Sequence, residues 1–191
     1  MENLHSFQEK LEREQNILLK DIPEIDLYMD QVIQLFENKF GDTKRNADEK
    51  ILTKTMINNY AKGKLLFPIK NKKYSKEHII LISLIYQLKG ALTIKDIQAT
   101  LEGLNKKVTT ENFPLDSLYE SYLQLSEENM ERFKDDIQAR MKEMNDEQTG
   151  TDEGEQNYLQ NVLLIASLVN MSNLYRRAAE KLVDEIVEER K

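Results

Sequence analysis

The stretch ILTKTMINNYAKGKLLFPIKNKKY, residues 51–74, differs in charge from the rest of the chain. From Lys50 to Lys76 there are eight lysines and no acidic residue, although the 191-residue chain carries a formal charge of −7. The remaining residues therefore carry −15. Solubility does not require a cationic stretch in an acidic protein, so this stretch indicates a negatively charged partner.

The first part of the stretch has the features of a helix. Thr53 is a suitable N-cap and Gly63 a suitable C-cap. Helical spacing predicts one face that packs on a core, made of Met56, Ile57, Tyr60 and Ala61. The opposite face would be exposed and would carry Thr55, Asn58, Asn59 and Lys62, which are residue types that contact bases and phosphates.

The second part of the stretch predicts a basic hairpin. Three apolar residues, 65–67, are followed by Pro68, which ends any helix. The sequence IKNKKY, residues 69–74, fits a very short β-hairpin with lysines at its tip. A helix followed by a basic hairpin is the arrangement of a winged helix.

Three segments resemble MerR-type winged-helix regulators. NYAKGKLLFP, residues 59–68, resembles the end of that family's recognition helix and the Leu-Leu-x-Pro segment after it. YSKEHI, residues 74–79, matches the family's Tyr-Ser-x-x-Asp-Leu, and LKGALTIKDI, residues 88–97, is similar to its Leu-x-x-Gly-x-Ser-Leu-x-Glu-Ile hinge. The resemblance covers residues 51–102 and implies an N-terminal MerR-like winged helix-turn-helix. The whole chain also resembles a group of Gram-positive bacterial proteins known only as a domain of unknown function.

The chain departs from the MerR pattern at several positions. The loop at residues 41–50 is longer than a tight helix-turn-helix turn, and the wing is shorter than the family's. Lys64 stands where the family has glycine, and His78 replaces an acidic residue. We expect His78 to be a surface residue in a first helical turn and Tyr74 to be structural.

The order of the predicted elements gives a mainly α fold in three parts. Residues 1–20 predict an amphipathic helix that packs on the body or on a second subunit, and residues 21–104 the winged helix with its very short β-hairpin wing. Residues 113–191 predict a C-terminal helical region, separated by a polar loop at 105–112.

Caps and apolar spacing predict the helices of the second part. Asp26 is the expected cap of a helix over residues 27–40, whose buried face comprises Tyr28, Val32, Leu35 and Phe36. Ser75 caps a helix that is apolar nearly all round and therefore central. Thr93 and Asp96 form a capping box for a short helix that ends before Gly103.

The C-terminal region begins at Pro114 with either two helices or one bent helix. Residues 145–155, NDEQTGTDEGE, predict an acidic loop, and residues 157–189 a last helix. From Gln156 to Tyr175 no residue is charged, but eight of these twenty residues are Gln, Asn or Ser, which argues against a membrane span. The last helix fits the middle of a bundle or a homodimer interface.

Nothing in the sequence predicts catalysis, a cofactor or a metal site. The chain has no cysteine, only two histidines in different elements and no phosphate-binding glycine loop. We therefore expect a protein that is not an enzyme. We also expect it to be cytoplasmic, because no signal peptide opens the chain.

We therefore expect a sequence-specific transcriptional regulator that binds double-stranded DNA as a homodimer, with an effector that the sequence does not identify. The helix at 53–62 would enter the major groove, and the wing at 69–74 would bind phosphates. The expected DNA-binding residues are Lys54, Thr55, Asn58, Asn59, Tyr60, Lys62, Lys64, Lys70, Lys72 and Lys73. In the alternative interpretation, a winged-helix protein-interaction module binds an acidic partner, or its own acidic loop, through the same lysines. Asn58 and Asn59 could also be plain solvated residues, and Tyr60 a core residue.

Overall fold

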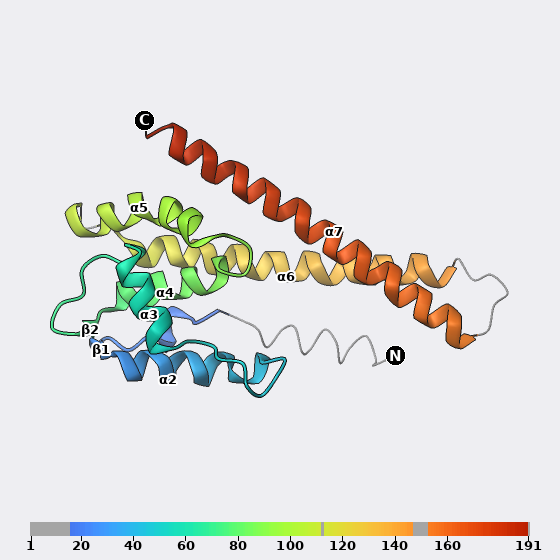
Figure 1. The fold of residues 1–191 in the computed structure, drawn as a ribbon, viewed down its shortest axis with the longest axis horizontal. Coiled ribbons are helices and arrows are strands. Elements are labelled where there is room, and N and C mark those ends of the chain that lie inside the picture. Colours follow the sequence, from blue (N-terminus) through green and yellow to red (C-terminus); the bar gives the residue numbers. More distant parts are fainter. Residues whose placement is uncertain (1–15, 112, 147–152, 191) are drawn as a thin grey trace. The chain divides into compact units, whose positions relative to one another are not determined.

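The computed structural model describes residues 16–111, 113–146 and 153–190. The described chain is mainly helical, with one small antiparallel sheet, so the predicted mainly α class is confirmed (Figure 1). The elements are η1 (Leu19–Asp21), β1 (Leu27–Tyr28), α2 (Met29–Phe40), η2 (Gly41–Thr43), α3 (Lys54–Lys62), β2 (Lys73–Tyr74), α4 (Lys76–Leu88), α5 (Ile94–Thr110), α6 (Leu115–Asp146) and α7 (Glu153–Glu188). None of the helices in these ranges is both long and apolar enough to cross a lipid bilayer.

The chain divides into two compact units, Met1–Leu125 and Ser126–Lys191. The boundary lies within α6 and not at residues 105–112. Residues 105–110 belong to α5, which continues as far as Thr110. The prediction of a polar loop at residues 105–112 is therefore wrong. The assignment of three functional domains stays a prediction.

Helix α4 forms the centre of the first unit. Seven of its thirteen residues are buried, namely His78, Ile79, Ile80, Leu81, Ile82, Ser83 and Ile85. This burial confirms the central position that its apolar sequence predicts. The other helices of the unit contribute buried residues to the same core, among them Phe36, Ile57, Ile97 and Tyr119.

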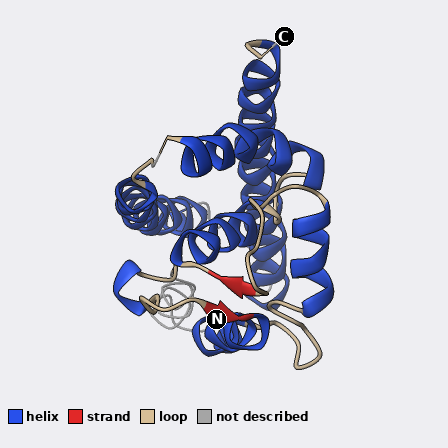
Figure 2. Ribbon diagram, turned by 90° about the vertical axis from the view of Figure 1, so that its left-hand side faces the viewer, coloured by secondary structure: helices blue, strands red, loops and turns tan. Residues whose placement is uncertain are grey.

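The small sheet joins two distant segments of the first unit, as the red strands of Figure 2 show. Strand β1 pairs antiparallel with β2, with Leu27 opposite Tyr74 and Tyr28 opposite Lys73. Just before β2 the chain forms a tight turn, in which Lys70 and Lys73 make an antiparallel bridge and the Lys73 N–H donates to the Lys70 carbonyl at 2.9 Å. Asn71 and Lys72 both have positive φ, 51° and 58°, which is the geometry of a type I′ hairpin turn. The short basic hairpin is therefore present, and β1 is a strand that the sequence did not predict.

The predicted start of α2 is wrong. Residues 27–28 are extended because they pair with β2, and the helix begins at Met29 with Tyr28 as N-cap. Asp26 is exposed and does not cap the helix. The buried residues of α2 are Val32, Phe36 and Phe40, whereas Tyr28 is 55% exposed and Leu35 is half-buried.

The predicted end of the fifth helix is also wrong. α5 begins at the expected capping box, where Asp96 Oδ2 accepts the Thr93 N–H at 3.1 Å, but it continues through Gly103 to Thr110. A glycine within a helix costs only about 1 kcal/mol relative to alanine, so tertiary contacts can outweigh it. One such contact comes from Asn105, whose Nδ2 donates to the Leu65 carbonyl at 2.9 Å.

The N-terminal residues of the first unit also differ from the prediction. Residues 1–15 of the helix expected at 1–20 lie outside the described residues, and residues 16–18 are not helical. Residues Asn16 and Ile17 are buried and accept hydrogen bonds from α6, at 2.9 Å from Tyr122 and 2.8 Å from Tyr119. Burial raises the pKa of Tyr119 to about 12, so its hydroxyl remains a neutral donor.

The second unit contains the end of α6 and all of α7. Helix α6 is one helix across the phase change at Ser126, and α7 covers the predicted last helix and begins slightly earlier. The Arg140 guanidinium of α6 donates to the Ser167 hydroxyl of α7 at 2.6 Å. Of the predicted acidic loop, residues 147–152 lie outside the described residues, and the residues on either side of them are helical.

Candidate nucleic-acid interface

Helix α3 is fixed at both ends by the predicted caps. The Thr53 hydroxyl accepts the Met56 N–H at 3.1 Å, and the Gly63 N–H donates to the Asn59 carbonyl at 2.8 Å. Gly63 also allows a close approach, since a Cβ atom there would lie 2.8 Å from Leu65 Cδ1. Both caps are confirmed, and they give the helix a defined length and direction.

Helix α3 presents its predicted polar face to solvent. Ile57 and Tyr60 are buried at 0% and 3% exposure, and the helix packs through them on the unit's core. The four residues predicted for the outer face, Thr55, Asn58, Asn59 and Lys62, are all exposed. Within the described chain, Asn58 and Asn59 make no side-chain hydrogen bond, so their amide groups are free to contact another molecule.

Tyr60 does not belong to this face. Its side chain is almost fully buried, and burial is the main cause that raises the pKa of its hydroxyl, with a smaller contribution from Tyr86. Of the two roles considered for Tyr60, the structure places it in the core. We therefore omit it from the interface.

Lys54 begins the helix and makes an ion pair with Asp30 of α2. The Nζ–Oδ1 distance is 2.6 Å, and both side chains are more than half exposed. An exposed pair of this kind contributes at most about 1 kcal/mol, so a phosphate can replace the carboxylate at little cost. Lys54 is therefore available at the first turn of α3.

Four other lysines lie on the surface after Asn59. Lys62, Lys64, Lys70 and Lys72 are all exposed, and none forms an ion pair with another described residue. Lys64 has a φ of 57°, which is the left-handed region that favours glycine. This is the position at which the MerR pattern has glycine.

Lys73 differs from the other predicted wing lysines. It is half-buried in β2, and its Nζ lies 5.3 Å from the centroid of the Tyr28 ring, which is a cation–π contact. Lys76, at the end of the basic stretch, is engaged by acids: its Nζ lies 3.0 Å from Glu24 and 3.1 Å from Asp116. The free positive charge is thus concentrated between Lys62 and Lys72.

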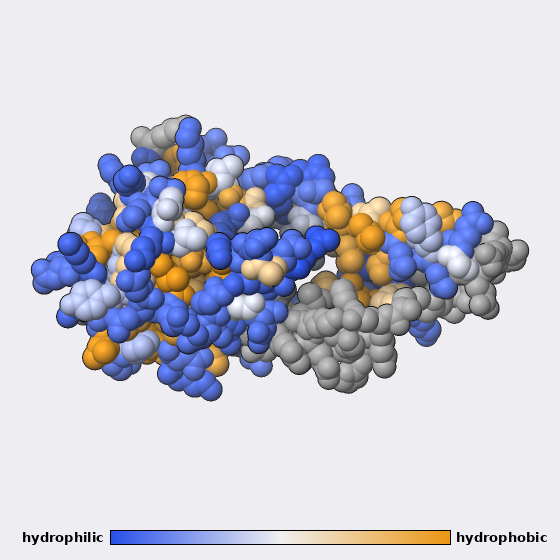
Figure 3. Space-filling model, turned by 60° about the horizontal axis from the view of Figure 1, so that its bottom comes forward, coloured by the Kyte–Doolittle hydropathy of each residue, from blue (hydrophilic) through white to orange (hydrophobic). Residues whose placement is uncertain are grey.

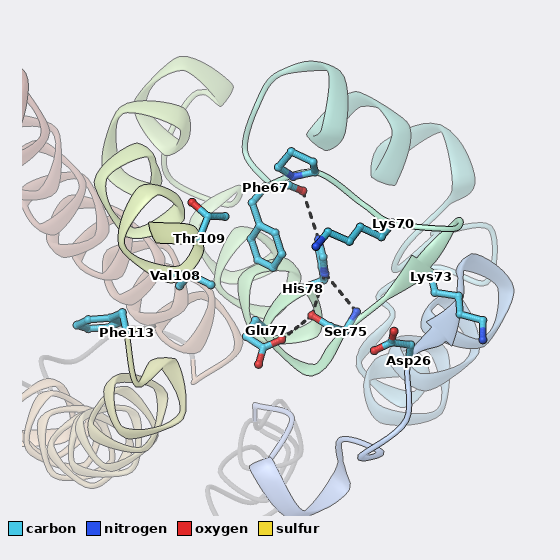
Figure 4. Close-up of a pocket in the computed structure, with 11 residues that line it drawn as sticks. Asp26, Phe67, Lys70, Lys73, Ser75, Glu77, His78, Val108, Thr109 and Phe113 are labelled. Atoms are coloured by element: carbon cyan, nitrogen blue, oxygen red, sulfur yellow. Dashed lines mark hydrogen bonds between the residues drawn. The ribbon is translucent and has the colours of Figure 1, made fainter. Parts of the chain in front are cut away.

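His78 is buried and not on the surface, so that prediction is wrong (Figure 4). Its Nδ1 accepts the Ser75 N–H at 3.1 Å, and its Nε2 lies 3.3 Å from the Phe67 carbonyl. A carbonyl only accepts, so Nε2 carries the proton and the imidazole is neutral. His78 therefore takes the place of an acid in the capping box, and it connects α4 to the segment before the hairpin.

The Ser75-x-x-His78 spacing contained the signal for this role. A capping box needs an acceptor at the third helical position, and a neutral imidazole supplies one. Burial is the main cause that lowers the pKa of His78, against smaller upward effects of the Phe67 hydrogen bond, Glu77 and Asp26.

The site contains no arrangement typical of metal binding. Among the residues that the structure describes, no three His, Asp or Glu side chains lie together so that they could hold a metal ion. What the arrangement offers is an exposed amide-bearing helix face beside a series of unpaired cations.

The first unit corresponds closely to a known sequence family. The model of the family described as "Domain of unknown function (DUF1836)" matches residues 17–122. The chain belongs to this family. No curated protein and no solved structure matches the chain. The matched range of DUF1836 contains both strands, helices α2–α5 and the start of α6, so the family domain includes the whole candidate interface.

Proposed function

We propose that this DUF1836 protein is a sequence-specific DNA-binding transcriptional regulator. Helix α3 would enter the major groove with Thr55, Asn58, Asn59 and Lys62, and Lys54, Lys64, Lys70 and Lys72 would bind flanking phosphates. Lys73 would contribute through its charge from the edge of the same surface. This role implies a cytoplasmic protein.

The observation that carries the proposal is the exposed amide face of α3 beside lysines without ion pairs. A side chain that reads bases must be unsatisfied within the protein, and Asn58 and Asn59 meet this condition among the described residues. The order of strand, two helices, hairpin and two helices also agrees with a MerR-like winged helix. The long connection between α2 and α3 departs from a tight helix-turn-helix.

We further propose that the protein acts as a homodimer through its second unit. Helix α7 exposes many large apolar side chains, and Figure 3 shows hydrophobic residues gathered on the part of the chain formed by α6 and α7. Two-fold symmetric regulators bind two half-sites, which roughly doubles the binding free energy that one reading helix provides.

A gel-shift experiment at low salt tests the proposal. The protein should retard a random-sequence duplex, because phosphate contacts act on any sequence. Selection from a randomised duplex library should then recover a preferred site. DNA binding would be contradicted if the duplex stayed unretarded at tens of micromolar protein, both with the wild type and with a variant that lacks residues 146–154.

The alternative is a protein-interaction module that binds an acidic partner. The excess of −15 outside residues 50–76 favours it, because the chain itself contains acidic segments, including 145–155, that could meet the lysines. Deletion of residues 146–154 distinguishes the cases. A duplex bound only by the deletion variant would indicate autoinhibition by the acidic segment.

A further inference from the structure

The first unit contains an open cleft of about 620 Å³ beside the hairpin turn. The segment before the turn, the first turn of α4 and the end of α5 line it, together with Phe113 (Figure 4). A volume of this size lies in the range of small-molecule sites, which is about 300–1,000 Å³. Of the residues that we propose to contact DNA, Lys70 and Lys73 also line this cleft.

One side of the cleft is apolar. Phe67, Val108 and Phe113 line it and are all half-buried, so each ring or branched side chain keeps surface that a ligand can cover. The Phe67 ring is held in place by His78, with ring centroids 3.8 Å apart at an interplanar angle of 36°. The cleft therefore offers a preformed surface on which a flat apolar ring can pack.

The other side carries one uncommitted positive charge. Figure 4 shows the Lys70 side chain extending toward His78, whereas Lys73 points away. Lys70 forms no ion pair with a described residue, and Lys73 is engaged with the Tyr28 ring. Glu77 accepts the Ser75 hydroxyl at 2.5 Å, and Asp26 is exposed at the border of the cleft.

We propose that this cleft binds a small aromatic carboxylate, with the ring on Phe67, Val108 and Phe113 and the carboxylate on Lys70. The two acidic groups, Glu77 and Asp26, repel a second negative charge and accept a hydrogen bond from a hydroxyl group on the ring. The ligand class is thus a monoanionic aromatic acid, preferably hydroxylated.

Amide NMR spectra of the full chain test the binding site directly. The probes are benzoate and 4-hydroxybenzoate, with benzamide and 4-hydroxybenzamide as neutral controls of the same shape. The acids should shift the amide signals of Ser75, Val108 and Thr109 in a saturable way, and the amides should bind more weakly by about tenfold, because they lose a charged hydrogen bond. Equal affinity of acids and amides would overturn the role of Lys70.

Two lysine variants, at positions 70 and 72, provide a matched test of the role of Lys70. Lys70→Met keeps the alkyl chain and should weaken the acids by about tenfold, whereas Lys72→Met, in the same turn but outside the cleft, should change their affinity by less than about twofold. Val108→Trp should fill the apolar side and abolish binding of acids and amides alike. Acid-induced shifts that persist in both Lys70→Met and Val108→Trp would place the ligand elsewhere and overturn the proposal.

The regulatory consequence rests on the proposed DNA-binding function. Lys70 belongs to both surfaces, so a carboxylate on Lys70 removes one phosphate contact and should weaken duplex binding by the wild-type chain. The two experiments fail separately: saturable shifts without any duplex binding would contradict only the DNA function. Duplex binding without saturable shifts at millimolar probe would contradict only the cleft.

Discussion

At the scale of single residues, His78 decides how α4 begins. The neutral imidazole satisfies the Ser75 N–H at Nδ1 and the Phe67 carbonyl at Nε2. Protonation of Nδ1 would turn this nitrogen from an acceptor into a donor, so the Ser75 N–H would lose its partner. The native state therefore favours the neutral form of this residue.

This preference predicts a pH dependence of stability. The pKa of His78 is lowered in the folded protein, so the unfolded chain binds a proton first as the pH falls below about 6.5. The contribution of His78 to stability is therefore complete above that pH and is lost as the pH falls through the folded-state pKa. The slope is at most about 1.4 kcal/mol per pH unit.

Urea unfolding between pH 8 and pH 5 measures this effect. His78→Gln is the control, because a glutamine oxygen can accept the Ser75 N–H but does not titrate. The variant should lose the part of the pH dependence that begins near pH 6.5, whereas His5 remains in both proteins. Identical pH profiles for the two proteins would show that His78 does not titrate in this range.

The reading residues give a second prediction at this scale. Asn58→Ala should weaken binding to the selected site by roughly 1–3 kcal/mol and leave binding to random duplex unchanged, since base contacts carry specificity. Asn59→Ala tests the neighbouring amide. Asn58 is the better candidate because it lies nearer the centre of the face shared with Thr55 and Lys62.

The lysines of the turn should behave differently. Replacing Lys70 and Lys72 together by alanine should weaken specific and random duplexes alike, and reduce the slope of log K against log salt by about 0.9 for each lost contact. A salt titration of both variant types measures the difference. If neither type changes either affinity, the surface does not bind DNA.

At the scale of the elements, local capping signals predicted helix ends correctly except where contacts with distant residues outweighed them, as at Asp26 and Gly103. Thr53, Gly63 and the Thr93–Asp96 pair gave correct helix ends because a cap depends on residues within one turn. Strand β1 escaped prediction because two residues are too short a run to show the period of a strand, and they are extended where they pair with β2. The length of α5 escaped prediction because contacts such as that of Asn105 with Leu65 outweighed Gly103.

The connection after α3 contains a strained position that predicts a stabilising substitution. Lys64 has a φ of 57°, and a residue with a Cβ atom in this region costs about 1–2 kcal/mol relative to its preferred conformations. Lys64→Gly should therefore raise the free energy of unfolding by about 1 kcal/mol while it weakens DNA binding through the lost charge.

The matched control is Lys64→Ala. It removes the same charge but keeps a Cβ atom, so its stability should remain near that of the wild type. Denaturant unfolding of the three proteins separates backbone strain from charge. Equal stabilisation by glycine and alanine would assign the effect to charge repulsion among the lysines.

At the scale of the whole molecule, the sequence predicted which residues of α3 are exposed, whereas the DNA-binding role and the assembly stay predictions. The four residues that helical spacing predicted for the exposed face of α3 are all exposed. Tyr60, which the spacing placed on the core face, is buried, so its interpretation as a core residue was correct and its inclusion among the DNA contacts was not. The burial of His78 was missed because it depends on Phe67, which the sequence places eleven positions away. Whether the surface binds DNA depends on a second molecule, and a single chain contains no contact that decides it.

The last prediction concerns the association of two copies of the chain. Leu159 and Leu163 lie one turn apart on α7 and are 50% and 64% exposed, and Ile165 and Val169, which are oriented away from them, are 61% and 54% exposed. Apolar residues on both sides of one helix exceed what packing on α6 alone can cover. We therefore expect a homodimer in which α7 is a main contact, with about 1,200–2,000 Å² buried in total.

Light scattering at tens of micromolar protein should give twice the 22.4 kDa mass of the chain. Leu163→Lys should shift the protein to monomer, because a lysine would lose hydration at the centre of an apolar contact. Asn161→Lys, at an exposed polar position two residues earlier, should remain a dimer. Since a monomer presents one reading helix, Leu163→Lys should also bind a single half-site as well as the full site, whereas the wild type should prefer the full site. A wild-type mass of one chain at this concentration would exclude the dimer, and the exposed residues of α7 would then need another partner.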